Sequence, residues 1–334
     1  MIWTTKPKKN PGGTTVFWGA AGALGDSSRQ DSHRKLGAFA WVTLAYNVTV
    51  ILWGAYVRVT GSGAGCGNHW PLCNGEVIPR AQHIQTLIEF THRVSSGIAL
   101  LTVVCLWIWT HLAMPRKHPA RYAGTAAVLL IINEALLGAS LVLFQHVAQD
   151  KSIARAVSLS LHSANTMLLL AAIALTAFWT WKPASSLLRW SACCATRIGA
   201  LLLILLFAGV TGAVTALGDT LFPAASLASS LAQDFSPNSH YLLRLRIVHP
   251  AVALLAAISL TWVVAEVWRS PNKALQCLAV IAGIVLILQL TLGALNVVLL
   301  APMWLQMGHL LVADVLWITL VLLAAESLII AGAQ

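Results

Sequence analysis

Charged residues are scarce in this chain of 334 residues: Asp and Glu together number 11, Lys and Arg number 21, and the four types make up only 10% of the sequence. Soluble domains carry about 25% charged residues, which cover their surface in water. Apolar residues make up 58% of this chain. The composition therefore excludes a soluble globular protein and is typical of an integral membrane protein.

Long polar stretches are also rare after residue 36, and eight apolar runs follow one another, each long enough to cross a hydrocarbon core about 30 Å thick. The runs begin near Gly37, Glu89, Gly124, Ala156, Ile198, Leu245, Ala274 and Met307. The sequence therefore predicts an all-α integral membrane protein with eight transmembrane helices. Residues 1–36 lack the apolar core and cleavage site of a signal peptide, so we expect a mobile cytoplasmic tail that stays attached.

Basic residues are shared unevenly between the two sets of loops. Cytoplasmic loops accumulate Lys and Arg, and the richer side contains Lys6, Lys8, Lys9, Arg29, Arg34, Lys35, Arg116, Lys117, Arg121, Lys182, Arg189, Arg197, Arg269 and Lys273. The other side contains only Arg58, Arg80, Lys151, Arg155, Arg244 and Arg246. We therefore expect both termini in the cytoplasm and the protein in the bacterial cytoplasmic (inner) membrane. The positive charge then indicates contact with anionic membrane lipids and no nucleic acid partner.

Cysteine is sparse, with six residues in the chain. Cys66 and Cys73 lie in the first outer loop, in the segment GSGAGCGNHWPLCNG, where Gly, Pro and Asn allow a tight loop. A disulfide between them would suit the oxidising compartment expected on this side. Two unpaired thiols are the alternative.

The chain also contains a weak internal duplication. WGAYVRVTGSG resembles TGAVTALGDT, and NEALLGASLVL resembles LQLTLGALNVVL, which pairs Glu134 with Gln289 and Gly138 with Gly293. FTHRVSSGIALL aligns with RIVHPAVALLAA, and SLHSANTMLLL aligns with MGHLLVADVLW. Each half has an even number of spans, so the repeat predicts two pseudo-symmetric four-helix bundles in parallel orientation. The expected segments are a tail at 1–36, a first bundle at 37–181, a cytoplasmic linker at 182–197 and a second bundle at 198–334.

Four histidines occupy equivalent positions in this repeat: His92, His162, His249 and His309. Each lies near the start of an even-numbered predicted helix, so all four should lie near the outer leaflet, two in each bundle. Ionisable groups at that depth usually face the bundle interior. Two imidazoles facing each other across a bundle suit the axial ligation of haem iron, whereas structural zinc requires four close ligands. A proton-relay transporter is an alternative.

Four arginines are available on the outer side for the propionates of such haems: Arg58, Arg80, Arg244 and Arg246. Guanidinium groups bind carboxylates in a bidentate manner. Arg58 and Arg246 are favoured because they lie nearest the predicted helix ends. The alternative is that all four are ordinary loop charges or interfacial anchors.

The two halves differ beside their first histidine. Glu89 lies three residues before His92 and shares a helix face with it, whereas Arg246 lies three residues before His249. This asymmetry suggests that chemistry takes place in the first bundle and that the second bundle holds a permanent redox cofactor. A structural salt bridge between Glu89 and Arg93, spaced four residues apart, is the alternative.

The sequence resembles the haem A synthase family over nearly its whole length, from Gly37 to Glu326. The resemblance rests on GAYVRVTGSGAGCGNHWPLCNG, EFTHR, LHSANT, the run GDTLFPA to DFSPNSHYLLRLRIVHP, and MGHLLVADVLW. The chain departs from the family in two places. It has no second cysteine pair between the fifth and sixth spans, which some members carry, and GNHW stands where many members have a Pro-Asp-Trp sequence.

This resemblance implies a membrane enzyme that oxidises the C8 methyl group of haem O to a formyl group in successive steps. Carried onto this chain, Glu89 would be the catalytic acid, His92 and His162 would bind the substrate haem, and His249 and His309 would ligate a haem b cofactor. The family's outer-loop cysteine pair would correspond to Cys66 and Cys73. A haem O synthase is a candidate partner, and the sequence does not identify the electron-transfer partner.

A diheme electron carrier that leaves haem unmodified is the rival interpretation. It accounts for the four histidines but gives Glu89 no purpose. A transporter built from repeats accounts for the duplication, but it does not explain why the histidines share one depth.

Overall fold

The computed structural model describes residues 19–80, 83–182 and 192–329 and is almost wholly helical there. Its long helices are α1 (Gly19–Val59), α2 (Ile84–Ala113), α3 (Pro119–Leu143), α4 (Ile153–Thr180), α5 (Ala192–Leu221), α8 (Val248–Val267), α9 (Lys273–Val298) and α10 (Met303–Ser327). Three short helices lie in the connections: η1 (Ser62–Ala64), α6 (Leu227–Phe235) and α7 (Tyr241–Leu245). Within the described ranges there is no strand, and an isolated bridge joins Cys73 and Glu76.

The predicted number of transmembrane helices is confirmed for the described residues, where eight helical segments are long and apolar enough to cross a membrane. The chain is thus a multi-pass membrane protein. The spans begin at Ser32, Ile84, Pro119, Ile153, Thr196, Tyr241, Lys273 and Met303. Each starts one to five residues earlier than the apolar pattern indicated, because polar residues at the membrane surface extend the helices beyond their apolar runs.

The N-terminal boundary differs more. The segment 1–36 was expected to be a mobile tail, but α1 begins at Gly19, so this segment is helical from Gly19 onward. Leu36 is fully buried, which means that packing begins before the apolar run starts at Gly37. Residues 1–18, and residues 183–191 of the predicted linker, lie outside the described residues.

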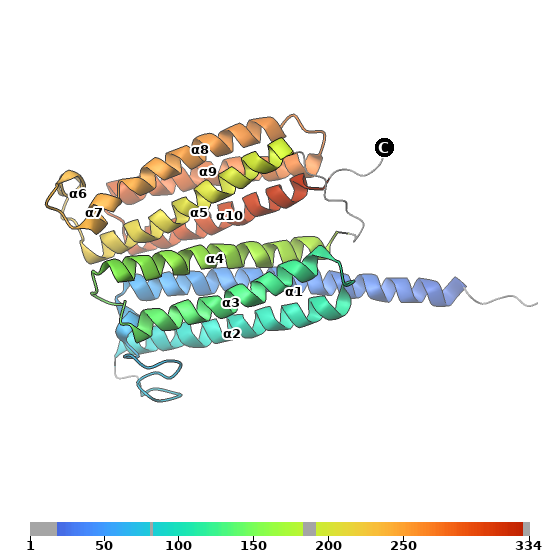
Figure 1. The fold of residues 1–334 in the computed structure, drawn as a ribbon, viewed down its shortest axis with the longest axis horizontal. Coiled ribbons are helices and arrows are strands. Elements are labelled where there is room, and N and C mark those ends of the chain that lie inside the picture. Colours follow the sequence, from blue (N-terminus) through green and yellow to red (C-terminus); the bar gives the residue numbers. More distant parts are fainter. Residues whose placement is uncertain (1–18, 81–82, 183–191, 330–334) are drawn as a thin grey trace, which may run out of the picture.

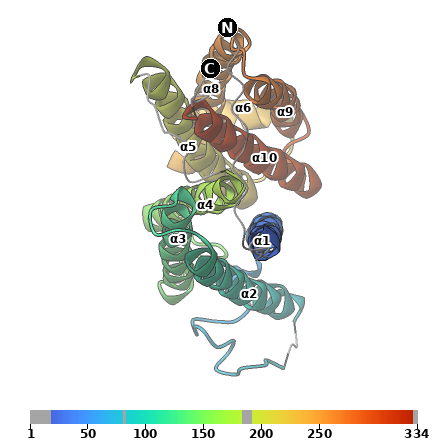
Figure 2. The same cartoon turned by 90° about the vertical axis from the view of Figure 1, so that its right-hand side faces the viewer.

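The first four long helices contact one another in a closed ring, α1 with α2, α2 with α3, α3 with α4, and α4 with α1. In the same way α5 contacts α8, α8 contacts α9, α9 contacts α10, and α10 contacts α5. Figure 2, a view along the helices, shows α2 and α4 diagonally opposite in the first ring. Helices α8 and α10 take the corresponding places in the second.

Helix α4 lies where the two rings meet, since it contacts α1 and α3 on one side and α5 and α10 on the other (Figures 1 and 2). Small residues allow this close approach: Ala172, Ala174 and Ala177 of α4 are at most 5% exposed. Large apolar side chains instead lie on outward faces, as with Ile284 and Ile287 of α9, which are 63% and 68% exposed. In a bilayer these faces contact lipid.

Side-chain caps define several helix starts. The Ser152 hydroxyl accepts from the Arg155 amide at 3.1 Å at the start of α4, and the Asn272 side chain accepts from the Ala274 amide at 2.9 Å at the start of α9. Each cap satisfies a backbone donor that has no partner within its helix.

His118 caps α3 and ties it to the end of α4. Its Nδ1 accepts from the Ala120 amide at 3.2 Å, so Nε2 carries the proton and donates to the Lys182 carbonyl, also at 3.2 Å. Burial lowers the pKa of His118, which keeps the ring in the neutral form that this double role requires.

We expect replacement of Trp317 to weaken the contact between the two rings. Trp317 of α10 is 5% exposed, and its Nε1 donates to the Met167 carbonyl of α4 at 2.7 Å. Trp317→Phe removes this bond and part of the packing, and should cost about 1 kcal/mol or more. Thermal unfolding of the purified protein in detergent measures the loss. Trp304→Phe is the matched control on the same helix, because Trp304 is 66% exposed; equal effects of the two changes would contradict this role.

Candidate functional site

The four histidines lie on α2, α4, α8 and α10, and each packs against a glycine of a neighbouring helix. A Cβ atom built on Gly54 of α1 would lie 3.0 Å from Cε1 of His92, and one on Gly212 of α5 would lie 3.0 Å from Cε1 of His249. The corresponding distances are 3.8 Å from Gly138 of α3 to Cε1 of His162 and 3.2 Å from Gly293 of α9 to Cε1 of His309. A glycine therefore faces an imidazole at all four positions of the repeat. At Gly54, Gly212 and Gly293 the ring lies so close that a Cβ would crowd it, and we call this contact a glycine notch.

The two imidazoles of the second half lie close together. The ring centroids of His249 and His309 are 6.3 Å apart, and the rings are nearly perpendicular, at 86°. Metal–imidazole nitrogen bonds are about 2 Å long, so this separation is wide enough for one metal ion between the two rings.

Hydrogen bonds fix one of these rings. His249 Nδ1 lies 3.1 Å from the Ala208 carbonyl, which can only accept, so Nδ1 carries the proton and the Nε2 lone pair is free for a ligand bond. His309 Nε2 lies 3.2 Å from the side-chain nitrogen of Gln289.

The ring nitrogens of the histidines also have little to bond to in the protein. Nδ1 of His92, His162 and His309 is buried and has no hydrogen-bond partner among the described residues. Buried polar atoms are normally paired. Histidines inside the helix rings whose ring nitrogens form few hydrogen bonds with the protein fit the axial ligation of a haem iron.

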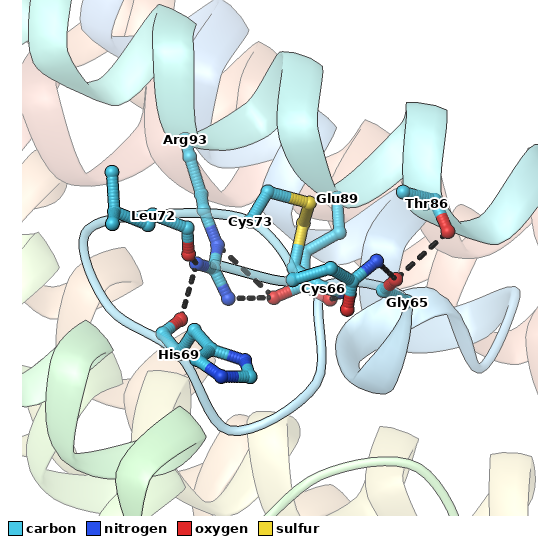
Figure 3. A network of polar contacts seen from close by, with 9 residues as sticks. Gly65, Cys66, His69, Leu72, Cys73, Thr86, Glu89 and Arg93 are labelled. Atoms are coloured by element: carbon cyan, nitrogen blue, oxygen red, sulfur yellow. Dashed lines mark hydrogen bonds and ion pairs between the residues drawn. A yellow bond between two sulfur atoms is a disulfide. The ribbon is translucent and has the colours of Figure 1, made fainter. Parts of the chain in front are cut away.

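Glu89 lies on α2 at the base of the loop between α1 and α2, which is the predicted first outer loop, as Figure 3 shows. Its side chain is almost fully buried, and Oε2 accepts from the backbone amide of Cys66 at 2.8 Å. Oε1 accepts from Nε of Arg93 at 3.1 Å and also from Nη2 of the same residue. The salt bridge considered as the alternative role of Glu89 is therefore present. Among the described contacts, none joins the carboxylate to His92.

Arg93 connects this carboxylate to the loop (Figure 3). Its Nη1 donates to the carbonyls of His69 and Leu72, each at 2.6 Å. The guanidinium thus holds Glu89 on one side and two loop carbonyls on the other, which fixes the loop over the outer end of α2.

The predicted disulfide is confirmed, since Cys66 and Cys73 are joined and both are buried. Next to it, the Thr86 hydroxyl of α2 donates to the Gly65 carbonyl at 2.8 Å. A Cβ atom on Gly65 would collide with the backbone of Gln85, so only glycine allows the loop to approach α2 this closely. The disulfide, Glu89, Arg93 and Thr86 together hold the loop on the helix.

The outer arginines fall into two kinds. Arg58 donates to the Ala216 carbonyl at 2.6 Å and to the Thr220 hydroxyl at 3.1 Å, both on α5, and lies 3.4 Å from the Gln306 side chain on α10. It therefore links the two helix rings. Arg80 and Arg244 are exposed.

Arg246, 7% exposed, forms ion pairs with Asp219 at 2.8 Å and with Asp234 at 2.7 Å. The two arginines favoured as propionate ligands, Arg58 and Arg246, thus already have partners within the protein. Their contact with a propionate stays a prediction.

One polar contact was not identified from sequence. The Oε1 atom of Glu134 on α3 lies 3.6 Å from His162 Nδ1, so the first half contains a second carboxylate beside a histidine. The signal was present in the repeat, which places Glu134 opposite Gln289, the residue that contacts His309.

A family model for cytochrome oxidase assembly proteins matches residues 37–321. The chain belongs to this family. A Thermus thermophilus protein named protoheme IX farnesyltransferase is 47% identical over 299 residues, which cover 88% of this chain and 48% of the relative.

Haem A synthases are also similar to this chain over part of its length. The haem A synthase of Alkalihalophilus pseudofirmus is 41% identical over 145 residues, covering 43% of this chain and 46% of the relative. That of an Exiguobacterium species is 34% identical over 138 residues, covering 41% and 45%. The resemblance to haem A synthases is confirmed. The chain spans about half the length of the curated relatives it matches.

We expect Arg93→Lys to release the outer loop. Lysine keeps the charge beside Glu89 but cannot also reach both loop carbonyls. Hydrogen bonds to charged groups contribute about 1.5–3 kcal/mol each, so amide exchange within residues 62–76 should become about tenfold faster or more. Hydrogen–deuterium exchange with mass spectrometry measures this, with Arg80→Lys as the control because Arg80 is exposed. Unchanged protection in Arg93→Lys would contradict the role.

Proposed function

We propose that this protein is a haem A synthase that oxidises the C8 methyl group of haem O to a formyl group, through an alcohol, within the membrane. The observation that carries the proposal is the set of four histidines that each face a glycine of a neighbouring helix, two in each half. The chain belongs to a family whose members similar to it include named haem A synthases.

The second half, residues 198–334, would hold a haem b cofactor between His249 and His309. When bound, haem b supplies a one-electron redox centre. The protein itself holds the imidazole centroids of His249 and His309 6.3 Å apart. The hydrogen bond from His249 to the Ala208 carbonyl keeps that histidine in the tautomer whose Nε2 is free.

The first half, residues 37–181, would bind the substrate haem O between His92 and His162. Oxidation of a methyl group leaves an electron-poor carbon, which a nearby carboxylate can stabilise or assist by accepting a proton. Glu89 is our candidate for this role. Arg93 pairs with its carboxylate and holds it near the start of α2.

We further propose that the protein lies in the bacterial inner membrane with both termini in the cytoplasm. The Lys and Arg distribution supports this orientation. The disulfide between Cys66 and Cys73 also supports it, because disulfides persist in oxidising compartments and this orientation would put the loop between α1 and α2 in one.

A haem O synthase is the proposed partner. The Thermus relative that this chain matches over about half of its length is named a protoheme IX farnesyltransferase. Transfer of a farnesyl group to protohaem gives the class of haem that the proposed reaction consumes, so the two activities would follow one another.

A diheme electron carrier is the second candidate, because the glycine notches are present in both halves and nothing in them distinguishes substrate from cofactor. The discriminating experiment is extraction of haem from cells that express this gene with a haem O synthase. Haem A in the extract supports the enzyme. Haem O alone, with a well-folded protein present, supports the carrier.

We expect Glu89→Gln to abolish most haem A formation per folded molecule, because it removes the negative charge and keeps the size of the side chain. Breaking a buried ion pair is costly in itself, by about 3–5 kcal/mol. Arg93→Gln therefore serves as the control, since it breaks the same pair and leaves the carboxylate. If both variants make haem A equally well once folded, Glu89 is structural.

We expect Gly212→Ala to reduce the haem b content of the purified protein, because its Cβ would lie 3.0 Å from the His249 ring and displace it. The pyridine haemochrome assay measures haem per polypeptide. Gly199→Ala on the same helix is the matched control, since a Cβ there meets nothing within 4 Å, and alanine favours a helix by about 1 kcal/mol over glycine. Full haem content in Gly212→Ala would contradict the site.

A further inference from the structure

A half-buried carboxylate lies beside one of the two histidines proposed to bind the substrate haem. Glu134 of α3 places Oε1 3.6 Å from Nδ1 of His162 on α4, with side chains only 17% and 26% exposed. Ionisable groups in a membrane span are costly and usually functional. The proposed reaction does not use Glu134.

Two neighbours on α4 hold this carboxylate in place. The Thr166 hydroxyl donates to Oε1 and the Asn165 amide donates to Oε2 at 2.6 Å. Residues 162, 165 and 166 lie on one face of the helix. Histidine, amide and hydroxyl therefore all converge on the same carboxylate, which fixes it against the histidine.

A second layer holds the amide. The Asn165 side chain also donates to the Leu130 carbonyl at 3.0 Å, and its oxygen accepts from Asn133 at 2.8 Å. With both functional groups of Asn165 in use, its amide cannot rotate away from Glu134. The contact with His162 is thus supported by side chains from both helices.

The second half has an uncharged residue at the equivalent position, and that residue contacts the other ring nitrogen of its histidine. Gln289 occupies the position of Glu134 in the repeat, and its nitrogen lies 3.2 Å from His309 Nε2. In each half the polar residue comes four positions before the facing glycine, Gly138 or Gly293. The two halves therefore share the histidine and the glycine that faces it. They differ in the polar neighbour: the Glu134 carboxylate lies beside Nδ1 of His162, whereas the Gln289 amide donates to Nε2 of His309.

We propose that Glu134 is a positioning residue for the substrate site: its carboxylate orients the His162 ring and increases the electron donation of that imidazole. A carboxylate behind a metal-ligating histidine raises the basicity of the ligand, and an amide does so less. A more basic ligand stabilises the oxidised metal. The first half should therefore hold its haem at a lower reduction potential than it would with an amide at this position. This inference rests on the proposed binding of substrate haem at His162.

The test exchanges the two residues in the full-length protein. Glu134→Gln, Gln289→Glu and wild type are purified in detergent, loaded with haem b and haem O, and titrated by spectroelectrochemistry with low-spin electron paramagnetic resonance spectra. Glu134→Gln should raise the potential of one haem centre and leave the other unchanged. Its haem O affinity should fall about tenfold or more. Gln289→Glu should lower the potential of the other centre.

Glu134→Asp separates charge from shape, because it keeps the carboxylate on a shorter side chain. It should retain more of the low potential than Glu134→Gln does. A purely structural role would change protein yield and leave the potentials of the folded molecules alike.

The outcomes separate the two proposals. If folded Glu134→Gln binds haem O with unchanged potential and affinity, the positioning role is overturned while the proposed function stands. If wild type binds no haem in its first half, the proposed function fails and the positioning role fails with it. If Glu134→Gln does not fold, Gln289→Glu decides, and an unchanged potential in that variant overturns the proposal.

Discussion

A bilayer core offers no hydrogen-bond partner to the polypeptide backbone, so every amide and carbonyl within it must be satisfied by the chain itself. The eight spans meet this requirement as helices. Polar side chains within the spans also need partners inside the protein. Histidines are set into glycine notches, and carboxylates are held by donors from adjacent helices or loops. The candidate sites are the places where ionisable side chains lie inside the helix rings, where burying a polar group costs free energy.

The two halves use opposite charges for the same structural task. Three residues before His92, Glu89 pairs with Arg93 and the Cys66 amide and so holds the first outer loop. Three residues before His249, Arg246 pairs with Asp219 and Asp234 and so joins the end of α5 to α6. The two halves therefore differ at this position in the sign of the charge that holds the neighbouring segment. If Glu89 is catalytic, it acts while its carboxylate is paired with Arg93 and the Cys66 amide.

Contacts between the two helix rings connect the two candidate sites. Arg58 extends from α1 to carbonyl and hydroxyl groups of α5, and Trp317 of α10 bonds to the backbone of α4. Since α4 carries His162 and α10 carries His309, the two candidate sites are built on helices that pack directly against each other. A change in one half can therefore reach the other through α4.

The sequence by itself determined the membrane class, the number of spans, the internal duplication, the cysteine pair and the four histidines, because each depends on composition or on spacing along the chain. It also identified the ion pair of Glu89 with Arg93 as an alternative, since residues four apart meet on a helix. Only the tertiary structure decided which distant groups meet these side chains: the Cys66 amide at Glu89, Glu134 at His162, Ala208 at His249, and the partners of Arg58 and Arg246. These contacts depend on how each helix is rotated about its axis and how closely it approaches its neighbours, and side-chain packing between segments far apart in the sequence determines both.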